Sequence, residues 1–287
     1  MTQKNVLLVG GDMRQLHASE ELAKHGFSPS HFALDTYKDS CELTLAITQA
    51  DIILLPVPVS RGEYMNFPLS STKLTPRVLA SEIVKNAKHD AVIFGGKFPT
   101  DMLTVFDNNG IKHYDICENE TFNYLNAVPT AEGAIALAMS NTPVTLDGSS
   151  CLILGYGRIG RCLSRRLRAL GASVTVAARK EKDRAEAASE GMTPVDYSLL
   201  SSLAEGFDAV FNTVPTTVLN EEVLFHLRSG VPVIELASKP GGVDAVGAIR
   251  HGTRVISAQS LPGRVAPVTA GKIIARCVLE LTAGGAK

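Results

Sequence analysis

Three glycines in the pattern GxGxxG carry the sharpest chemical signal in the sequence. Gly155, Gly157 and Gly160 come directly after the apolar run 151–154 and open a segment with the apolar spacing of a helix. In such a turn the first glycine permits a tight bend, the second lets the backbone approach a diphosphate, and the third lets helix and strand pack closely. The helix start offers N–H groups and a positive dipole end to the diphosphate. The residues predicted to form this dinucleotide site are Gly155, Tyr156, Gly157, Arg158, Ile159 and Gly160.

The end of the next predicted strand indicates which dinucleotide the turn selects. A site for NAD places Asp or Glu there to bind the ribose hydroxyls, whereas this chain has Ala178, Arg179 and Lys180. A pair of cations accepts a 2′-phosphate that a carboxylate would repel. The sequence therefore favours NADP(H) as the cofactor.

Basic residues are concentrated around this motif. Residues 158–184 include nine basic and two acidic side chains, and such an excess attracts phosphate groups. Arg165 and Arg168 fall inside the predicted helix rather than at its start. For these two, a solvated helix face is the simpler interpretation.

Two later strand ends are expected to line the nicotinamide half of the site. A proline at 215 stops the predicted strand 209–212 at the sheet edge, and small polar residues there line a ring without filling its space. An ordinary turn from strand to loop is the alternative. The residues predicted to face the cofactor in these two loops are Asn212, Thr213, Val214, Pro215, Ala237 and Ser238.

Cations that follow predicted strand ends indicate a site for an anionic substrate. Parallel strands bring their carboxyl ends to one edge of a sheet, where ligands bind in a cleft. A carboxylate that leaves water needs fixed cations. Taken singly, each cation has a solvated surface charge as its simpler explanation. The residues predicted to bind substrate are Arg14, Ser60, Arg61, Lys97, Lys239 and Arg264.

Glu132 and Lys239 are the candidates for catalysis. Glu132, two residues after Thr130, is the carboxylate best suited to transfer a proton. Stabilisation of a helix start is the alternative role for Glu132. Lys239 is expected to pair with a substrate carboxylate. The seven histidines and five cysteines have no ligand spacing, so no metal site is predicted.

Apolar runs alternate with amphipathic helical segments through both halves of the chain. This alternation predicts an α/β protein with two doubly wound parallel sheets, each covered on both faces. The strands predicted in the first half are residues 6–9, 32–34, 52–57, 91–94 and 113–116, and the helices are 14–25, 76–86 and 101–109. The strands predicted in the second half are residues 151–154, 173–177, 209–212, 233–236 and 253–257.

The two halves are expected to join within residues 127–147. There Pro129 is predicted to begin a helix that runs to Asn141. The predicted domains are an N-terminal α/β domain, 1–128, and an NADP-binding Rossmann domain, 129–269. A terminal helix within 270–287 is expected to pack back on the first domain.

Composition excludes several classes of protein. The chain has 287 residues, of which 45% are hydrophobic and 20% are charged, a profile typical of a globular protein. Its net charge of -1 gives no field that favours nucleic acid or an anionic membrane. No apolar run reaches membrane-spanning length, and the five scattered cysteines are typical of free thiols in a reducing compartment. A cytoplasmic location is therefore expected.

Three segments resemble the D-2-hydroxyacid dehydrogenase superfamily: TAEGAIALAM, LGYGRIG and ASKPGGVD. The resemblance implies a flavodoxin-like N-terminal domain and a Rossmann cofactor domain. In that superfamily an arginine binds the substrate carboxylate where this chain has Lys239, and a catalytic histidine lies in the last loop of the cofactor domain. The corresponding segment here, 258–271, contains no histidine. Since oxidation of an alcohol needs a base, this departure argues against ordinary 2-hydroxyacid oxidation.

A narrower resemblance covers the chain from Val9 to Gly271. The segments VGGDMRQ, LPVPVS, VPTAEG, GYGRIG, NTVP, LASKPGG and LPGRVAPVTAG follow in this order, and together they resemble the dipicolinate synthase A subunits of spore-forming bacteria. The resemblance implies an NADP-dependent enzyme that works with a flavoprotein-like B subunit. It also implies a location in the mother-cell cytoplasm during sporulation.

The substrate implied by this resemblance is 4-hydroxy-tetrahydrodipicolinate, a cyclic imine dicarboxylate. Loss of water gives a dihydropyridine, and removal of a hydride to NADP+ completes an aromatic ring. Because the hydride leaves a ring carbon, that step deprotonates no alcohol, which agrees with the missing histidine. The protein then acts mainly by positioning, and Lys239, Arg264 and Arg14 are expected to hold the two carboxylates.

Two other functions stay open from the sequence. One is an NADP-dependent reductase of another small keto or imino acid. The other is a non-catalytic cofactor-binding scaffold, which the lack of an obvious acid–base pair favours. The sequence leaves open which residue assists dehydration, where the B subunit binds, and whether the chain forms a homo-oligomer.

Overall fold

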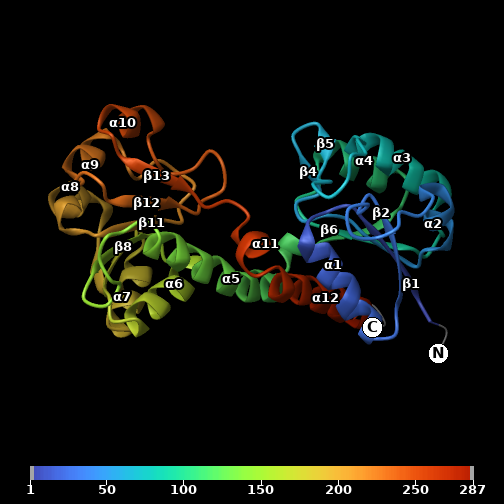
Figure 1. Ribbon diagram of the computed structural model, residues 1–287, viewed down its shortest axis with the longest axis horizontal. Helices are drawn as coiled ribbons and strands as arrows, with labels where there is room; N and C mark the ends of the chain where they lie inside the picture. Colours follow the sequence, from blue (N-terminus) through green and yellow to red (C-terminus); the bar gives the residue numbers. More distant parts are fainter. Residues whose placement is uncertain (1–2, 285–287) are drawn as a thin grey trace. The chain divides into compact units, whose positions relative to one another are not determined.

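The computed structural model describes residues 3–284 and divides the chain into two compact units (Figure 1). Unit 1 is Met1–Leu125 with Ala266–Lys287, and unit 2 is Asn126–Val265. The sequence places the corresponding limits at 128 and 269. Residues 285–287, the end of the expected terminal helix, lie outside the described residues. Unit 2 is therefore a continuous stretch of chain inserted into unit 1.

A five-stranded parallel sheet forms the centre of unit 1. Its strands are β1 (Asn5–Val9), β2 (Ser28–Phe32), β3 (Ile52–Leu54), β6 (Val92–Gly95) and β7 (Lys112–Asp115). They lie in the flavodoxin-like order β2-β1-β3-β6-β7. Because successive strand residues face opposite sides, Leu7 and Val9 pack into one core while Val6 and Leu8 pack into another.

Helices cover both faces of the unit 1 sheet. The elements on one side are α2 (Leu43–Gln49), α3 (Pro76–Asn86) and α4 (Thr100–Asn108), and those on the other are α1 (Met13–Lys24) and α12 (Pro267–Gly284). The hairpin β4 (Ser60–Arg61) and β5 (Tyr64–Met65) and the short helix η1 (Ile116–Glu118) complete the unit. Helix α12 packs along α1 (Figure 1). Gly271 permits this contact, because a Cβ there would lie 2.6 Å from the carbonyl oxygen of Arg14.

Unit 2 contains a six-stranded parallel sheet. Its strands are β8 (Ser150–Leu154), β9 (Ser173–Ala177), β10 (Thr193–Val195), β11 (Ala209–Asn212), β12 (Pro232–Glu235) and β13 (Arg254–Ser257). The order β10-β9-β8-β11-β12-β13 is that of a Rossmann fold. Successive strands are added on one side of β8 as far as β10, and then on its other side from β11 to β13. The predicted fold class, α/β with two parallel sheets, is confirmed.

Two helical layers enclose the unit 2 sheet. The elements on one face are α5 (Glu120–Met139), α6 (Arg158–Ala169), α7 (Glu181–Ser189) and α11 (Leu261–Val265). The elements on the other are η2 (Tyr197–Leu199), α8 (Leu200–Leu203), η3 (Ala204–Gly206), α9 (Glu221–His226) and α10 (Ala245–Arg250). Leu163 and Leu167 of α6 are fully buried against the sheet, so the start of α6 is held at the end of β8.

The prediction that Pro129 begins a helix is wrong, because Pro129 lies inside α5. A proline within a helix lacks the N–H that bonds to the preceding turn. The Thr130 hydroxyl donates to the carbonyl oxygen of Asn126 at 2.7 Å in this turn. Phe122 and Ala127 are buried before the proline, and we attribute the continuation of the helix through it to this packing.

Several strands differ from the sequence prediction, and the strand expected at 52–57 ends at Leu54, as β3. The strand expected at 32–34 lies earlier, at β2, because Ala33 has φ +57° and leaves the extended conformation. Ala33 and Leu34 are buried all the same, which explains the misleading apolar signal. Strand β10 was not predicted, since it is an edge strand with Thr193 and Pro194 exposed.

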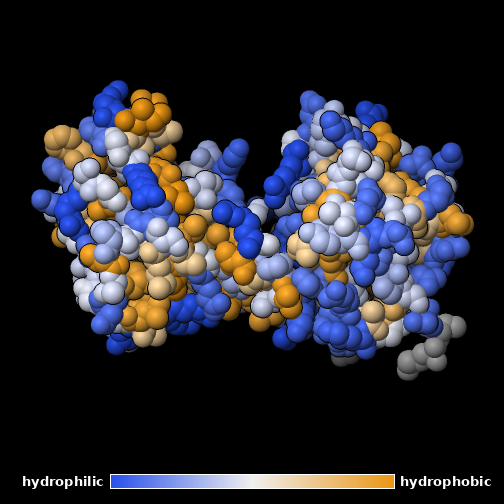
Figure 2. Space-filling view, viewed as in Figure 1, coloured by the Kyte–Doolittle hydropathy of each residue, from blue (hydrophilic) through white to orange (hydrophobic). Residues whose placement is uncertain are grey.

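The surface is mixed in polarity, and apolar side chains are visible over α10 (Figure 2). Val246 and Ile249 of that helix are exposed. Within residues 3–284, no helix is both long enough and apolar enough to cross a membrane. The same described residues contain no group of three or more His, Cys, Asp or Glu arranged to hold a metal ion.

Candidate cofactor and substrate site

The glycine turn joins β8 to α6 at the carboxyl edge of the unit 2 sheet. Gly155 has φ +91°, and a Cβ on it would lie 2.6 Å from Thr213 Oγ1. A Cβ on Gly160 would lie 2.3 Å from the carbonyl oxygen of Gly155. Both positions therefore need glycine for the shape of the turn and for the close packing of α6.

Gly157 has a different environment from the other two glycines. It is the N-cap of α6, and a Cβ there would meet no atom of the described chain within 4 Å. No side-chain hydrogen bond from a described residue caps this helix start. Arg158 is exposed and Ile159 is half-buried in the first turn. This open start fits a diphosphate, which the N–H groups of the first turn would bind.

Tyr156 faces away from the open side of the turn. Its side chain is 2% exposed and belongs to the core of unit 2. The Arg161 guanidinium lies over the ring, 4.9 Å from its centroid, and burial raises the pKa of the phenol. Only the main chain of Tyr156 is therefore placed to contact a cofactor.

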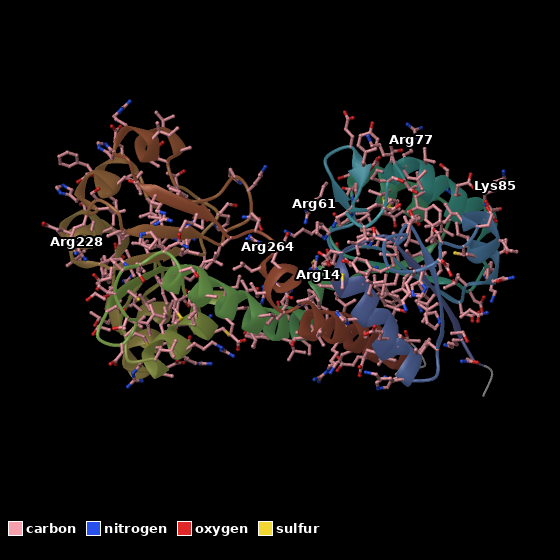
Figure 3. The ribbon with its side chains drawn as sticks, in the orientation of Figure 1. Arg14, Arg61, Arg77, Lys85, Arg228 and Arg264 are labelled. Carbon is pink, nitrogen blue, oxygen red and sulfur yellow. The ribbon has the colours of Figure 1, made fainter. Side chains whose placement is uncertain are left out.

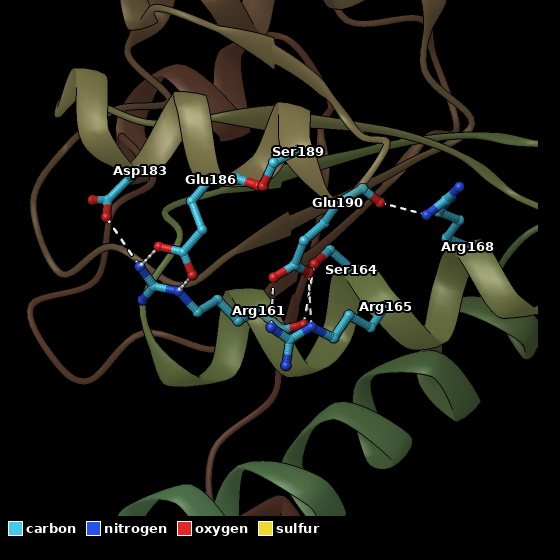
Figure 4. A network of polar contacts seen from close by, with 8 residues as sticks. All are labelled: Arg161, Ser164, Arg165, Arg168, Asp183, Glu186, Ser189 and Glu190. Atoms are coloured by element: carbon cyan, nitrogen blue, oxygen red, sulfur yellow. Dashed lines mark hydrogen bonds and ion pairs between the residues drawn. The ribbon is translucent and has the colours of Figure 1, made fainter.

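Three arginines of α6 contact α7 or Glu190, the residue after it (Figure 4). Arg161 donates to Glu186 at 2.6 Å and to Asp183 at 3.1 Å. Arg165 donates to Glu190 at 2.7 Å, and Arg168 donates to the Glu190 main-chain oxygen. Arg165 and Arg168 are both exposed, as expected for a solvated helix face. Their contacts give them a further role, because both help join α6 to the α7 region.

The turn after β9 presents the two cations predicted to select the cofactor. Ala178 is buried, whereas Arg179 and Lys180 are exposed, and neither side chain makes a hydrogen bond or ion pair with a described residue. Arg184 donates to the carbonyl oxygens of Ala178 and Arg179 at 2.7 and 2.9 Å, and to Asp196 at 2.7 Å. Arg184 thus holds the turn, while the side chains of Arg179 and Lys180 extend into solvent.

The residues after β11 form one wall of the site. Asn212 is fully buried. Its side-chain amide accepts a hydrogen bond from the N–H of Val214 at 3.1 Å and donates one to the carbonyl oxygen of Val214 at 3.0 Å. The Thr213 hydroxyl donates to the carbonyl oxygen of Leu154 at 2.8 Å. Val214 is half-buried and Pro215 is exposed. The polar atoms of Asn212 and Thr213 are therefore used to fix the loop.

Glu235, at the end of β12, was missed by the sequence prediction. Its carboxylate accepts hydrogen bonds from Asn212, from the N–H of Ala237 and from the N–H of Gly242. The sequence did hold a signal for this residue, because a carboxylate within the apolar segment 233–236 needs hydrogen-bond partners. Ala237 is buried and Ser238 is exposed in the loop that follows.

Lys239 and Arg264 are the cations of unit 2 predicted to bind substrate. Lys239 is exposed next to Ser238, and its peptide bond to Pro240 is cis. Arg264 is exposed on α11 (Figure 3), a short helix that the sequence prediction did not include. Neither side chain makes a hydrogen bond or ion pair with a described residue, so both are available to an anion.

Arg14 differs from the other predicted cations because it is buried, with 7% of its surface exposed. It lies in the first turn of α1 (Figure 3) and binds the carboxylate of Asp12 through two hydrogen bonds of 2.8 and 2.9 Å. It also donates to the carbonyl oxygen of Val57. Most of its hydrogen-bonding capacity therefore serves the fold of unit 1.

The other predicted substrate residues of unit 1 lie on the chain between β3 and α3 and directly after β6. Ser60 is half-buried and Arg61 is exposed in the β4–β5 hairpin. Lys97 is exposed after the Gly95–Gly96 pair and has φ +54°. Cys117 is close to this segment, since a Cβ on Gly96 would lie 2.9 Å from its sulfur. Burial raises the pKa of the Cys117 thiol to about 11. The thiol therefore stays protonated at neutral pH.

Glu132 does not lie with the other candidates of unit 2. It is exposed on α5, and its carboxylate is 3.6 Å from Arg166 in the second half of α6. The first half of α6 begins at the glycine turn, so this contact is distant from the open N-terminus of the helix. Within unit 2, the structure instead brings the glycine turn, the 213–215 loop and the 237–242 loop to the same sheet edge.

Comparisons with known families match both units. The family model for the N-terminal domain of the dipicolinate synthase A subunit matches residues 5–117. The model described as D-isomer specific 2-hydroxyacid dehydrogenase, NAD binding domain, matches residues 130–238. Unit 2 is therefore a nicotinamide-dinucleotide-binding domain of the dehydrogenase type.

Similarity to single proteins extends over the whole chain. The dipicolinate synthase A subunit of Bacillus subtilis (strain 168) is 31% identical over 291 residues, which cover 99% of this chain and 97% of that protein. The crystal structure of the dipicolinate synthase A subunit from Bacillus halodurans has a TM-score of 0.89 at 30% identity and covers 98% of both chains. The crystal structure of the Bacillus subtilis protein has a TM-score of 0.88 at 29% identity, covering 99% of this chain and 97% of that one.

Proposed function

The chain belongs to the family of dipicolinate synthase A subunits, and we propose that it is an NADP-dependent dehydrogenase that forms dipicolinate. The observation that carries the cofactor assignment is the pair of exposed cations, Arg179 and Lys180, at the end of β9. They follow a glycine turn whose helix start is open and uncapped. Two cations at this position favour a 2′-phosphate over a free ribose hydroxyl.

The proposed reaction has two steps. First, 4-hydroxy-tetrahydrodipicolinate loses one water molecule to give dihydrodipicolinate. Second, the dihydropyridine ring gives one hydride to NADP+ and one proton to water, which yields dipicolinate and NADPH. The cofactor supplies the hydride acceptor. The segment 258–271 contains no histidine, which fits a reaction that removes hydride from a ring carbon rather than from an alcohol.

The residues of this chain contribute positioning and charge. The glycine turn and the Arg179–Lys180 pair would hold the diphosphate and the 2′-phosphate of the cofactor. Lys239 and Arg264 are exposed and unpaired within the described chain, which suits them to bind substrate carboxylates. Ser60, Arg61 and Lys97 of unit 1 stay predicted substrate residues. Orientation of a ring against the cofactor is the main rate effect that such a site offers.

A second protein completes the proposal. The relatives are named as the A subunits of a synthase, which implies a partner, and we propose a flavoprotein-like B subunit that works with this chain in the mother-cell cytoplasm. A flavin then belongs to the partner and not to this chain. The partner's part is measured by adding it to the same assay.

The test measures binding and turnover separately. Isothermal titration gives the affinities of the purified chain for NADPH and NADH. Freshly generated 4-hydroxy-tetrahydrodipicolinate is then added with NADP+, with and without the B subunit, while absorbance reports NADPH and the aromatic product. We expect tighter NADPH binding, and equal amounts of NADPH and dipicolinate. Product without NADPH formation would contradict hydride transfer to NADP+.

A non-catalytic scaffold is the second candidate. The observation that favours a scaffold is the ion pair of Glu132 with Arg166. In this contact the carboxylate predicted to transfer a proton pairs with an arginine of α6 instead. A scaffold would bind NADPH in the titration. It would form no NADPH from NADP+ and substrate, whether or not the B subunit is present. The same assay therefore separates the two functions.

A further inference from the structure

We propose that Glu235 is a positioning residue that fixes the two loops beside the nicotinamide half of the cofactor site. The inference rests on the binding of a nicotinamide dinucleotide by unit 2. It adds a residue that lies outside the glycine motif and outside the set predicted from the sequence. The observation that carries it is a single carboxylate that joins the ends of two strands and the loops that follow them.

The carboxylate of Glu235 accepts four hydrogen bonds. Oε1 accepts from the N–H of Ala237 and from the Asn212 amide, both at 2.9 Å. Oε2 accepts from the Asn212 amide at 3.0 Å and from the N–H of Gly242 at 3.2 Å. Glu235 lies on β12, Asn212 lies on β11, and the two residues are register partners in the sheet. The carboxylate thus bridges neighbouring strands at their carboxyl ends.

Asn212 connects the Glu235 carboxylate to the loop after β11. Its side chain is fully buried and bonds the N–H and the carbonyl of Val214. The Val214 side chain in turn borders the glycine turn, 2.7 Å from the position of a Cβ on Gly155. The loop after β11 therefore depends on a buried amide that Glu235 holds in one orientation.

Gly242 joins the second loop to the first. A Cβ at this position would lie 2.3 Å from the carbonyl oxygen of Val214 and 2.4 Å from the Asn212 amide nitrogen. The carbonyl oxygen of Gly242 accepts from the N–H groups of Val218 and Leu219, both at 3.0 Å. The two loops are thus packed and hydrogen-bonded against one another, and the Glu235 carboxylate is bonded to Asn212 and to the second loop.

Only a carboxylate satisfies all these donors. A glutamine has the same length but one acceptor oxygen and one NH2 group. In the variant E235Q this NH2 group would face either the Asn212 amide or a main-chain N–H. Opposed donors that stay unsatisfied in a half-buried position are costly, so E235Q loosens the loops while it preserves the volume of the side chain.

The test compares ligands with and without nicotinamide. Isothermal titration measures the binding of NADPH and 2′-phospho-ADP-ribose, and of NADH and ADP-ribose, to the wild-type chain and to E235Q. We expect E235Q to weaken the dinucleotides by roughly tenfold, and the fragments by less than about twofold. The fragments retain the diphosphate and adenosine groups, which the glycine turn and the β9 turn hold. The use of both pairs keeps the test valid whichever dinucleotide the chain prefers.

Asp208 provides a matched control at the opposite edge of the same sheet. Its carboxylate accepts from the N–H of Ser150 at 2.8 Å and from Arg228 at 2.7 Å. We expect D208N to lower the melting temperature without changing the ratio of dinucleotide to fragment affinity. The variant G242A is a second probe of the loops, because it inserts a Cβ against Val214 without changing the carboxylate. It should reproduce the ligand pattern of E235Q.

The outcomes separate the inference from the cofactor assignment. Equal weakening of dinucleotides and fragments in E235Q and G242A, or no weakening of either, would overturn the positioning role while cofactor binding stands. Wild-type protein that binds none of the four ligands would overturn the cofactor site, and the role of Glu235 with it. Selective loss of dinucleotide affinity in both variants, with D208N unchanged, supports the inference.

Discussion

The guanidinium of Arg184 donates a hydrogen bond of 2.7 Å to the main-chain carbonyl oxygen of Ala178. The same Nη1 atom contacts the carbonyl oxygen of Arg179 at 2.9 Å and the carboxylate of Asp196 at 2.7 Å. One side chain of α7 thereby anchors the turn that carries Arg179 and Lys180. The charge of Arg184 is compensated by Asp196, so its effect on a cofactor passes through the shape of this turn.

Replacement of Arg184 by alanine should therefore weaken NADPH more than NADH. Without the three contacts the turn is free to move, and the cations at its tip lose their fixed position. We expect a loss of roughly tenfold for NADPH, measured by titration. Arg161→Ala is the control, because Arg161 is another ion-paired arginine, which joins α6 to Glu186 and Asp183 of α7 and makes no hydrogen bond to the turn after β9. Similar losses in both variants would refute the role of Arg184.

The double variant R179D/K180S tests the selectivity of the proposed site directly. It replaces two cations with one carboxylate and one small polar group, which is the arrangement that suits ribose hydroxyls. We expect the affinity for NADPH to fall by about two orders of magnitude, with a much smaller change for NADH. Equal losses for the two cofactors would place the 2′-phosphate elsewhere.

Gly157→Ala should separate cofactor binding from folding. A Cβ at this position would meet no atom of the described chain within 4 Å. The variant should therefore keep the melting temperature of the wild-type protein within a few degrees. The methyl group would occupy the space that the diphosphate needs, so cofactor affinity should fall at least about tenfold. Gly206→Ala is the control, because Gly206 also has open space around its Cβ position and lies outside the site. A Gly157→Ala protein with normal affinity would contradict the diphosphate assignment.

The ion pairs between α6 and the α7 region predict how stability depends on pH. Hydrogen bonds from Arg161 and Arg165 hold the pKa values of Glu186 and Glu190 below their usual value of 4.5. A carboxyl group with a lowered folded-state pKa adds stability that is present above the unfolded-state value and is lost as pH falls through the folded-state value. The melting temperature should therefore fall below about pH 4.5.

Removal of these carboxylates should flatten the acid side of that profile. In the variant E186Q/E190Q the melting temperature at neutral pH is expected to be lower, with a smaller further fall in acid. Circular dichroism melts from about pH 3 to 7 measure both effects. Glu132→Gln is the control, because its single contact with Arg166 is 3.6 Å long. An unchanged acid slope in the double variant would mean that other carboxyl groups control acid unfolding.

The substrate cations are expected to divide into two kinds. Lys239→Ala and Arg264→Ala should each raise the KM for substrate by roughly tenfold, because each removes a charge that pairs with a carboxylate. Neither should change the affinity for NADPH or the melting temperature. Arg14→Ala should instead lower the melting temperature, since it leaves Asp12 and the Val57 carbonyl without their buried partner. Normal KM values in both surface variants would exclude them from the substrate site.

Local patterns in the sequence were sufficient to predict much of the structure of unit 2. Strands β9 and β11 begin and end at the predicted residues, because both are short apolar runs bounded by polar or turn residues. The glycine spacing predicted the turn, and the structure gives Gly155 and Gly160 the close contacts that require glycine. These features depend only on neighbouring residues, which a sequence displays directly.

Features that depend on distant partners were not predictable in the same way. Arg14 has the same type and position relative to a strand as the other cations, and only Asp12 and Val57 make it a buried structural residue. Glu235 gains its role from an amide on another strand. Pro129 normally marks a helix boundary, but it lies within α5. Val57 and Asn212, the partners that reveal the roles of Arg14 and Glu235, both lie on segments distant in the sequence.

The order of the chain has a consequence for the way this protein forms during synthesis. Residues 126–265 make a continuous unit, whereas the first unit needs α12 from beyond it to cover α1. Domains generally fold as units while the ribosome extends the chain. The unit that is synthesised second is thus the first to become complete. Until residues 267–284 emerge, the side of α1 that packs on α12 is exposed, and transiently exposed apolar surface favours aggregation.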